Sequence, residues 1–288
     1  LLAFATLVRP ITYYLIIILM VILTIIWKVY WHQRWRKICM LLMVVFIPWV
    51  FLIGGWQLRN YLSTGSLTFS TIQGRSLLFY RAADIIAQRD GIPLEEAQRR
   101  LGYQNYQALH PETRTWTEAQ LHQHWIREGI KIIRDHPGLL LKSQFLGIVR
   151  MLFGPGERGL LVYMGLGAEG AGPGISLFKM SPREYIRTWI LKKPCQFGLF
   201  LFASSYLMVV YIGVVIALWR LVDIREETRG DFIRSKTFKG SNLLIWVIVL
   251  YLLLISAGPE AYSRFRAPVM PFFSLYGGYG LYHFIKRR

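Results

Sequence analysis

Long runs of apolar residues separate the charged segments of this chain. Five runs contain no Asp, Glu, Lys or Arg, at residues 11–27, 38–58, 194–219, 243–259 and 267–285. Each run holds about 17 to 26 residues, and roughly 20 helical residues cross the hydrocarbon of a bilayer. The pattern therefore predicts an all-α polytopic membrane protein with about five transmembrane helices.

The residues after the second run are mixed in polarity and predict helices outside the membrane. Gly91-Ile92-Pro93 predicts the start of a short helix, with Pro93 at its first position and Gly102 at its end. Thr115-Trp116-Thr117-Glu118 is a capping-box pattern for a longer helix that ends at His136-Pro137. One apolar face of that helix carries Leu121, Trp125 and Ile132.

Residues 138–193 combine apolar stretches with basic and aromatic residues. The run 139–153 carries Lys142 and Arg150 and is about 15 residues long, which is short for a span, so we expect an interfacial amphipathic helix. Residues 154–174 predict a glycine-rich loop, and Ser181-Pro182-Arg183-Glu184 predicts a second capped helix.

The pattern divides the chain into four parts. These are two transmembrane helices with a cytoplasmic loop (1–58), an outer helical domain (59–137), interfacial amphipathic helices with the glycine-rich loop (138–193), and three transmembrane helices (194–288).

The distribution of charge predicts the orientation in the membrane. The net charge is +18, and short loops rich in Lys and Arg mark the cytoplasmic side of a membrane. Residues 28–37, residues 220–239 and the terminal Lys286-Arg287-Arg288 then share the cytoplasmic side, and residues 59–193 lie outside.

The outer segment keeps a surplus of positive charge that topology does not require. It either attracts anionic membrane lipid or is an ordinary basic surface, and charge held against a membrane argues against nucleic acid as a partner. Nothing at Leu1 resembles a cleavable signal peptide, and residue 1 falls outside, so we expect further spans upstream. Cys39 and Cys195 fall in apolar runs and are interpreted as small apolar residues.

Arg59 and Asn60 follow the second run, at the depth where a lipid phosphate lies. A guanidinium binds phosphate through paired N–H groups, so Arg59 is a candidate phosphate ligand. The alternative is an arginine that snorkels from the end of a span.

The short loop between the fourth and fifth runs is crowded with polar residues: Glu260, Tyr262, Arg264 and Arg266. It is too short to need so many charges for solubility. An acid beside two arginines is either a structural ion pair or a site that holds a phosphate leaving group and orients an acceptor.

His122 and His124 lie near Glu118 on the predicted long helix and raise the question of a metal site. Positions two apart on a helix point about 200° apart, so the two imidazoles do not easily share a metal. No Ser-His-Asp or Cys-His arrangement and no phosphate-cradling glycine loop is present. We predict no metal site and no cofactor, with a divalent cation left open as an alternative.

A series of short motifs runs along the chain: Trp56-Gln57-Leu58-Arg59-Asn60-Tyr61 with Gly65, Ser70-Thr71 and Gly74, then His136-Pro137, Gly154-Pro155-Gly156, and Ser263-Arg264-Phe265-Arg266-Ala267-Pro268 with Pro271. In their order and their placement relative to the spans, these motifs resemble those of bacterial membrane glycosyltransferases of the GT-C superfamily. The resemblance is to family 39, related to protein O-mannosyltransferases and aminoarabinose transferases, and it runs from Trp49 to the end of the chain.

The resemblance implies a reaction. Members take a sugar from a polyprenyl-phosphate carrier and transfer it to a lipid, glycan or protein acceptor of the cell envelope, on the outer face of the bacterial cytoplasmic (inner) membrane. An inverting transfer needs a carboxylate base and cations near the departing phosphate. In the family the carboxylate lies in the first outer loop, which we expect upstream of residue 1, so this chain alone is expected to be inactive.

The same resemblance implies the site. The arginines implied to hold the donor phosphate are Arg59, Arg264 and Arg266. The residues implied to line the substrate site are Asn60, Gln73, Tyr80 and Glu260.

Three other classes stay open. A transporter of a lipid-linked precursor predicts ionisable residues in mid-span, and the five runs hold only His283, near one end. An O-antigen polymerase or ligase also has a large outer loop with arginines. A receptor or assembly protein would leave the arginines at the membrane boundary unexplained.

Overall fold

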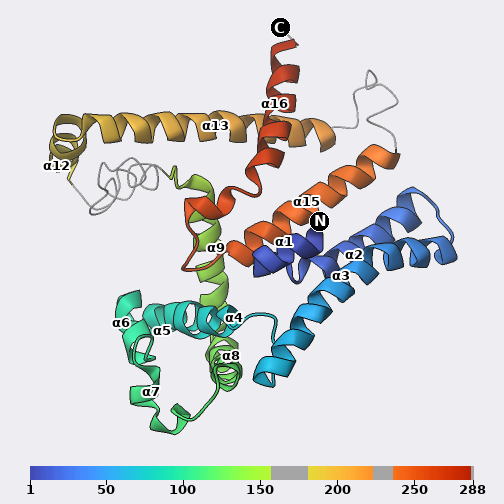
Figure 1. Ribbon diagram of the computed structural model, residues 1–288. Helices are drawn as coiled ribbons and strands as arrows, with labels where there is room; N and C mark the ends of the chain where they lie inside the picture. Colours follow the sequence, from blue (N-terminus) through green and yellow to red (C-terminus); the bar gives the residue numbers. More distant parts are fainter. Residues whose placement is uncertain (157–180, 223–235, 287–288) are drawn as a thin grey trace. The chain divides into compact units, whose positions relative to one another are not determined.

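The computed structural model describes residues 1–156, 181–222 and 236–286, and these residues form helices joined by turns (Figure 1). No strand occurs among them. The predicted all-α fold class is confirmed.

Four helical segments are long and apolar enough to cross a membrane: Pro10–Tyr30, Trp35–Thr64, Pro194–Arg220 and Lys239–Ser256. They correspond to the first four predicted spans, and the chain is a polytopic membrane protein. The fifth predicted span is a shorter helix, α16 (Met270–Lys286, 17 residues), and its crossing of the membrane stays a prediction.

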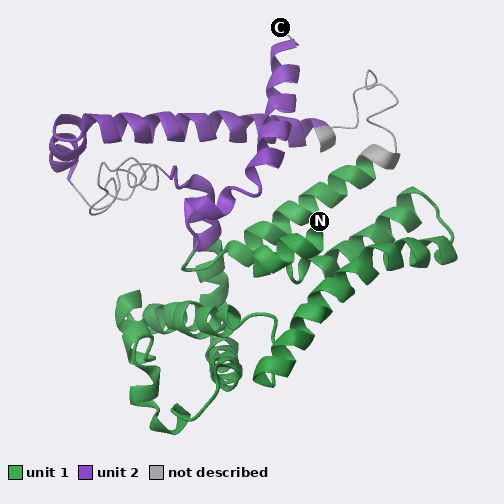
Figure 2. Cartoon of the chain, in the orientation of Figure 1, with its two compact units in different colours: residues 1–146, 229–260 green, residues 147–228, 261–288 purple. Residues whose placement is uncertain are grey.

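The chain forms two compact units, each described by itself (Figure 2). Unit 1 comprises Leu1–Leu146 and Arg229–Glu260, and unit 2 comprises Gly147–Thr228 and Ala261–Arg288. These units follow contacts within the folded chain, whereas the division at residues 58, 137 and 193 follows composition and stays a prediction.

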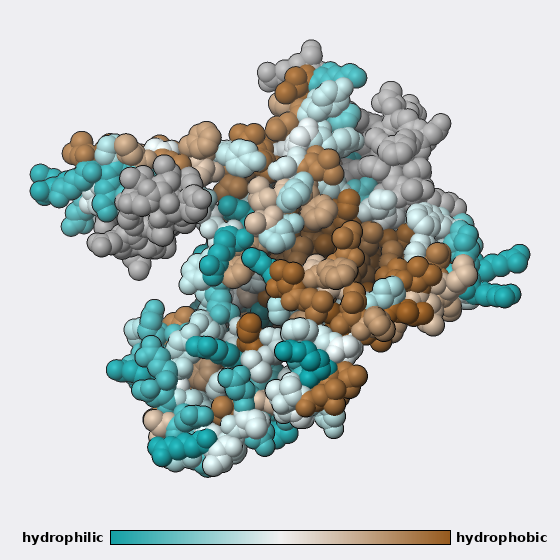
Figure 3. Space-filling view, viewed as in Figure 1, coloured by the Kyte–Doolittle hydropathy of each residue, from teal (hydrophilic) through white to brown (hydrophobic). Residues whose placement is uncertain are grey.

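The apolar helices of unit 1, which include its three long membrane segments, pack around a small apolar core. They are α1 (Leu2–Val8), η1 (Pro10–Thr12), α2 (Leu15–Ile25), η2 (Ile26–Tyr30), α3 (Trp35–Thr64) and α15 (Lys236–Ser256). Ile22, Trp27 and Ile38 are buried where α15 also contributes apolar side chains. Many apolar residues remain exposed, as Figure 3 shows in brown over these helices, which fits contact with lipid.

The polar part of unit 1 is a bundle of short helices. It consists of α4 (Ile72–Ser76), η3 (Leu77–Ala82), α5 (Ala83–Asp90), α6 (Leu94–Arg100), α7 (Tyr106–Leu109), η4 (Pro111–Thr113), α8 (Glu118–Asp135) and the start of α9 (Pro137–Phe153). Phe79 is fully buried against Leu121 and Trp125 of α8, with Ile132 beside them. The predicted apolar face of α8 is therefore confirmed.

Helices α6 and α8 begin within two residues of the positions predicted from the sequence. The capping box of α8 uses Thr117 and Gln120, so the prediction from Thr115 and Glu118 is wrong by two residues. Glutamine closes a capping box as glutamate does, which the predicted pattern overlooked. Pro93 is the residue before α6 rather than its first residue, because its backbone is still extended.

Unit 2 contains the end of α9, α12 (Pro182–Tyr185), η5 (Ile186–Leu191), α13 (Pro194–Val222), η6 (Ser263–Arg266) and α16. The capping box of Ser181 and Glu184 is confirmed. Helices α13 and α16 pack at backbone distance, with Gly213 against Gly277 and Gly280. Small residues permit such close approach of membrane helices.

Two predicted loops lie largely outside the described residues. They are the glycine-rich loop at 154–174, of which 154–156 are described, and the charged loop at 220–239.

Candidate functional site

The last turns of α3 hold the segment that follows them. Three side-chain N–H groups donate to consecutive backbone carbonyls: Trp56 Nε1 to Phe69 (3.3 Å), Asn60 Nδ2 to Thr68 (3.0 Å) and Gln57 Nε2 to Leu67 (3.0 Å). The motif after the second span therefore has a structural task, which the sequence alone did not reveal. Asn60, predicted to line the site, uses its amide N–H for this task.

Arg59 is an exposed cation near the C-terminal end of α3. Helix α3 has 30 residues, about 45 Å, so it extends past a hydrocarbon layer of about 30 Å. The Arg59 guanidinium lies 4.8 Å from the centre of the Trp56 ring, and its Nη1 donates to Asn60 Oδ1 at 3.3 Å. These contacts orient the guanidinium while it stays exposed, which suits an anionic headgroup.

Glu260, just after α15, meets α4. The Ser76 hydroxyl donates to Glu260 Oε2 at 3.3 Å, although the two residues are 184 positions apart. Both side chains are half-buried. Polar segments that follow two different membrane spans are thus brought together within unit 1.

Tyr80 extends this polar cluster, which we define as Arg75, Ser76, Tyr80, Tyr103 and Glu260. The hydroxyls of Tyr80 and Tyr103 are 2.7 Å apart, and the Arg75 guanidinium lies 5.0 Å from the centre of the Tyr103 ring. The bond to Tyr103 raises the pKa of Tyr80 to about 12, with burial and the charge of Glu260 adding to the effect. At neutral pH the phenol is therefore protonated and able to donate a hydrogen bond.

Arg81 of η3 connects the cluster to the end of α15. Its Nη2 donates to the carbonyls of Ile255 (2.9 Å) and Ala257 (3.3 Å), at the end of α15. Burial lowers the pKa of Arg81, and the negative charge of Glu260 opposes this. Arg81 thus fixes the end of α15 and, through it, the start of the Glu260 segment.

Sequence reasoning missed Arg81. The available signal was a single arginine among the apolar residues of 77–83, because a cation in such a stretch needs a buried partner. Gln73, unlike Arg81, was predicted to line the site. In the structure its Oε1 accepts a hydrogen bond from the Tyr14 hydroxyl at 3.4 Å.

The two arginines of the Ser263–Arg266 turn have different environments. Arg266 is 7% exposed, and its Nη1 donates to the carbonyls of Met151 (3.1 Å), Leu152 (2.6 Å) and Gly154 (3.0 Å) at the end of α9. Arg264 is exposed, with its guanidinium 5.5 Å from the ring centre of Tyr262 and 5.1 Å from that of Phe265. Arg264 is available to an anion, whereas Arg266 is committed to the backbone.

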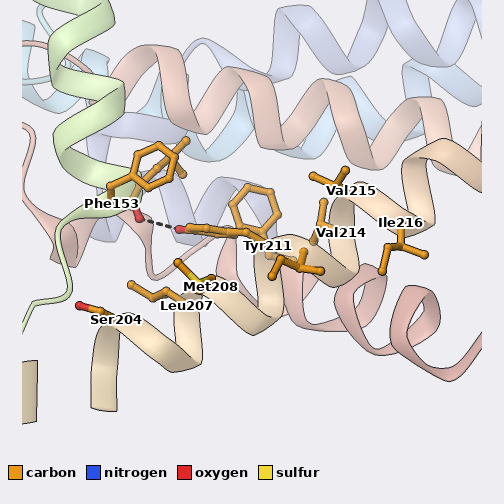
Figure 4. Close-up of a pocket in the computed structure, with 11 residues that line it drawn as sticks. Phe153, Ser204, Leu207, Met208, Tyr211, Val214, Val215 and Ile216 are labelled. Carbon is orange, nitrogen blue, oxygen red and sulfur yellow. Dashed lines mark hydrogen bonds between the residues drawn. The ribbon is translucent and has the colours of Figure 1, made fainter. Parts of the chain in front are cut away.

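Unit 2 contains an apolar cavity of about 640 Å³ (Figure 4). It is lined by Leu152 and Phe153 of α9, by Phe273 of α16, and by α13 residues Ser204, Leu207, Met208, Tyr211, Ile212, Val214, Val215 and Ile216. The Tyr211 hydroxyl points to the α9 end of the cavity and donates to the carbonyl of Leu152 at 2.7 Å. Arg266 also donates to the Leu152 carbonyl. The cavity wall is therefore apolar along α13, and polar groups lie next to its α9 end.

Sequence reasoning missed this cavity because every lining residue of α13 also fits an ordinary membrane helix. Its chemistry suits a long apolar chain, since nearly all lining side chains are aliphatic or aromatic. Several of them, including Met208 and Val215, are exposed on the surface of a membrane-spanning helix. The cavity is therefore partly lined by side chains that are also exposed on the outer surface of α13.

Within the described residues, no group of three His, Cys, Asp or Glu side chains is arranged to hold a metal ion. His122 is buried, and His124 lies against the rings of Tyr106 and Trp116.

No protein-family model, curated protein or solved structure matches this chain.

Proposed function

We propose that this protein is a membrane glycosyltransferase that uses a sugar carried on polyprenyl phosphate and transfers it to a hydroxyl of a lipid, glycan or protein acceptor. The proposal places it in the bacterial cytoplasmic membrane with residues 59–193 outside. It rests on the resemblance to family 39 together with one structural observation. That observation is the apolar cavity on α13, whose wall at Leu152 is held by the turn that also presents Arg264.

The cavity supports a lipid-linked donor because an isoprenoid chain is apolar throughout and gains by leaving water or filling a void. Arg264 and Arg59 are exposed guanidinium groups, the first lying against two aromatic rings and the second against one, and either suits a phosphate. Arg266 takes no direct part in this scheme and instead holds the turn in place.

The chemistry of the transfer fits these groups. The acceptor oxygen attacks the anomeric carbon, the bond from that carbon to the phosphate oxygen breaks, and the phosphate leaves with the electron pair. Cations beside the phosphate stabilise the charge that develops there. A carboxylate takes the proton of the acceptor hydroxyl.

Binding of undecaprenyl phosphate to the purified protein in nanodiscs tests the proposal. Ser204→Trp fills the cavity, and Ser205→Trp on the neighbouring exposed position is its matched control. We expect Ser204→Trp to weaken binding by on the order of tenfold, as loss of a well-filled apolar contact does, and Ser205→Trp to leave it unchanged. Arg264→Gln should weaken binding of undecaprenyl phosphate but not of undecaprenol, which has no phosphate.

Two results would contradict the proposal. One is retention of undecaprenyl phosphate no better than that of phosphatidylglycerol, and the other is equal binding by the two tryptophan variants. Preference for an undecaprenyl pyrophosphate carrier would instead favour an O-antigen polymerase or ligase. Transfer from polyprenyl-phosphate hexoses to envelope extracts then identifies the sugar and acceptor.

A further inference from the structure

His122 of α8 is enclosed by protein, at 1% exposure. Its Nδ1 lies 3.1 Å from the backbone nitrogen of Gly74 and 3.0 Å from the carbonyl oxygen of Thr71. The Gly74 N–H belongs to the first turn of α4, where a helix supplies no acceptor of its own. His122 therefore gives this amide a partner that the helix cannot.

The two contacts of Nδ1 require different protonation states of this nitrogen: unprotonated for the Gly74 N–H and protonated for the Thr71 carbonyl. A neutral imidazole with its proton on Nε2 accepts the Gly74 N–H through the lone pair of Nδ1. An imidazole that carries a proton on Nδ1 cannot accept it and donates to the Thr71 carbonyl instead. One nitrogen thus serves either the amide or the carbonyl.

The fit at Gly74 shows how closely α4 is held. A Cβ at this position would lie 2.6 Å from both Nδ1 and the backbone oxygen of His122, so only glycine allows this approach. Ser76, two residues further along α4, donates to Glu260, and Arg75 lies over the Tyr103 ring. The hold on Gly74 therefore orients the residues that α4 contributes to the polar cluster.

We propose that His122 is the positioning residue for the Ser76–Glu260 pair and that protonation of its imidazole releases α4. In the neutral state, with the proton on Nε2, the Gly74 N–H is held and Ser76 faces Glu260. In the protonated state the amide loses its acceptor, Nδ1–H turns to Thr71, and the start of α4 loosens. An effect on sugar transfer rests on the proposed function, whereas the release of α4 does not.

Helices α4 and η3 pack against α8 around His122. The charged or titratable groups on these elements and one turn away on α8 are Arg75, Tyr80, Arg81 and Glu118. Arg75 and Tyr80 are directed at Tyr103, and Arg81 is directed at the carbonyls that end α15.

Protonation of His122 is governed mainly by its burial. Burial lowers the pKa of His122 from its ordinary value of 6.5, and the Thr71 carbonyl opposes that effect. Release of α4 is therefore expected on the acidic side of pH 6.5.

Hydrogen exchange of the intact protein in nanodiscs tests the proposal without any substrate. Peptides covering residues 72–78 and 255–262 are compared at about pH 7.5 and about pH 5.0, either side of an ordinary histidine pKa. Rates are corrected for the intrinsic pH dependence of exchange, and residues 94–100 of α6 serve as the internal reference. We expect both peptides to exchange faster at the lower pH, by on the order of tenfold for 72–78.

The variant His122→Asn places a side-chain amide oxygen near the position of Nδ1 and cannot titrate in this range. Exchange over residues 72–78 should then be slow at both pH values, while His124→Asn should keep the wild-type response. Equal corrected rates in the wild type, or an undiminished pH response in His122→Asn, overturns the proposal. If the Asn variant does not fold, the wild-type comparison still decides, and undecaprenyl phosphate binding at neutral pH reports separately on the proposed function.

Discussion

Arg264 and Arg266 are separated by a single phenylalanine, yet only Arg266 is buried. Arg266 joins the turn Ser263–Arg266 to the end of α9 through three carbonyls. Arg264 lies against two aromatic rings on the exposed side of the same turn. One arginine builds the turn, and the other is presented by it.

The first prediction separates the two arginines by stability. Arg266→Gln should lower the free energy of unfolding by about 3 kcal/mol, because it removes a buried charged donor and the hydrogen bonds that three backbone carbonyls accept from it. Arg264→Gln, a matched change at an exposed site, should leave stability within about 0.5 kcal/mol. Denaturation in detergent measures both, and equal losses would contradict this division of roles.

The second prediction concerns the close contact of α13 and α16. A Cβ on Gly280 would collide with the backbone oxygen of Gly213, whereas a Cβ on Gly278 has nothing within 4 Å. Gly280→Ala should therefore destabilise the protein by about 2 kcal/mol through overpacking. Gly278→Ala should be neutral or stabilising by up to about 1 kcal/mol, since alanine favours helix. Thermal unfolding of the two variants in the same detergent makes the comparison.

Much of the fold follows from the sequence because it depends on local patterns. Uncharged runs of span length identified the four long membrane helices, and the capping residues Ser181 and Glu184 marked the start of α12. Apart from α6, whose start and end were predicted, the short η and α pieces between residues 72 and 113 were not resolved individually. They are too short to show a period, and packing on Phe79 rather than intrinsic propensity determines them.

The candidate site was predicted less well because it depends on contacts between distant residues. Glu260 and Tyr80 were singled out, but nothing local indicates that Glu260 meets Ser76 or that Arg81 holds the end of α15. Arg266 could not be distinguished from Arg264, since burial of an arginine is decided by the tertiary fold. His122 was considered only as a metal ligand, and its contact with Gly74 joins two helices far apart in sequence.

The third prediction tests the close approach of α4 and α8. Gly74→Ala should cost about 1–3 kcal/mol, because the new Cβ meets the backbone of His122 as well as its ring. Gly138→Ala is the control, since a Cβ there has nothing within 4 Å and the residue is also helical and exposed. Chemical denaturation followed by tryptophan fluorescence gives both values. An unchanged Gly74→Ala protein would mean that the two helices are not in contact here.

The fourth prediction concerns the segment tied to the end of α3. Gln57→Ala removes the donor to the Leu67 carbonyl and should speed hydrogen exchange over residues 66–71 by about fivefold, the effect of one lost hydrogen bond of about 1 kcal/mol. Arg59→Gln leaves the three side-chain hydrogen bonds to the carbonyls of residues 67–69 in place and should not change exchange there. If Arg59→Gln speeds exchange over the segment equally, these three hydrogen bonds are not what holds it.

The fifth prediction is a pH dependence of stability in two steps. The pKa of His122 is lowered by burial, so the unfolded chain binds this proton more readily, and stability should fall as pH drops below 6.5. The pKa values of Asp90 and Glu96 are lowered by hydrogen bonds from Arg89 and Arg100, below their ordinary 3.8 and 4.5. Folding therefore disfavours protonation of these carboxyls as well, and a second loss should follow below about pH 4.5.

Variants separate the two steps. His122→Asn should remove the step near neutral pH and keep the acidic one, while Glu96→Gln should weaken only the acidic step. Both changes follow from the sign of the pKa shift, because removing a group that resists protonation in the folded state removes its pH dependence. Unfolding midpoints measured between about pH 7.5 and pH 3.5 cover both windows. A near-neutral step that survives His122→Asn would assign it to another group and would separate the release of α4 from protonation.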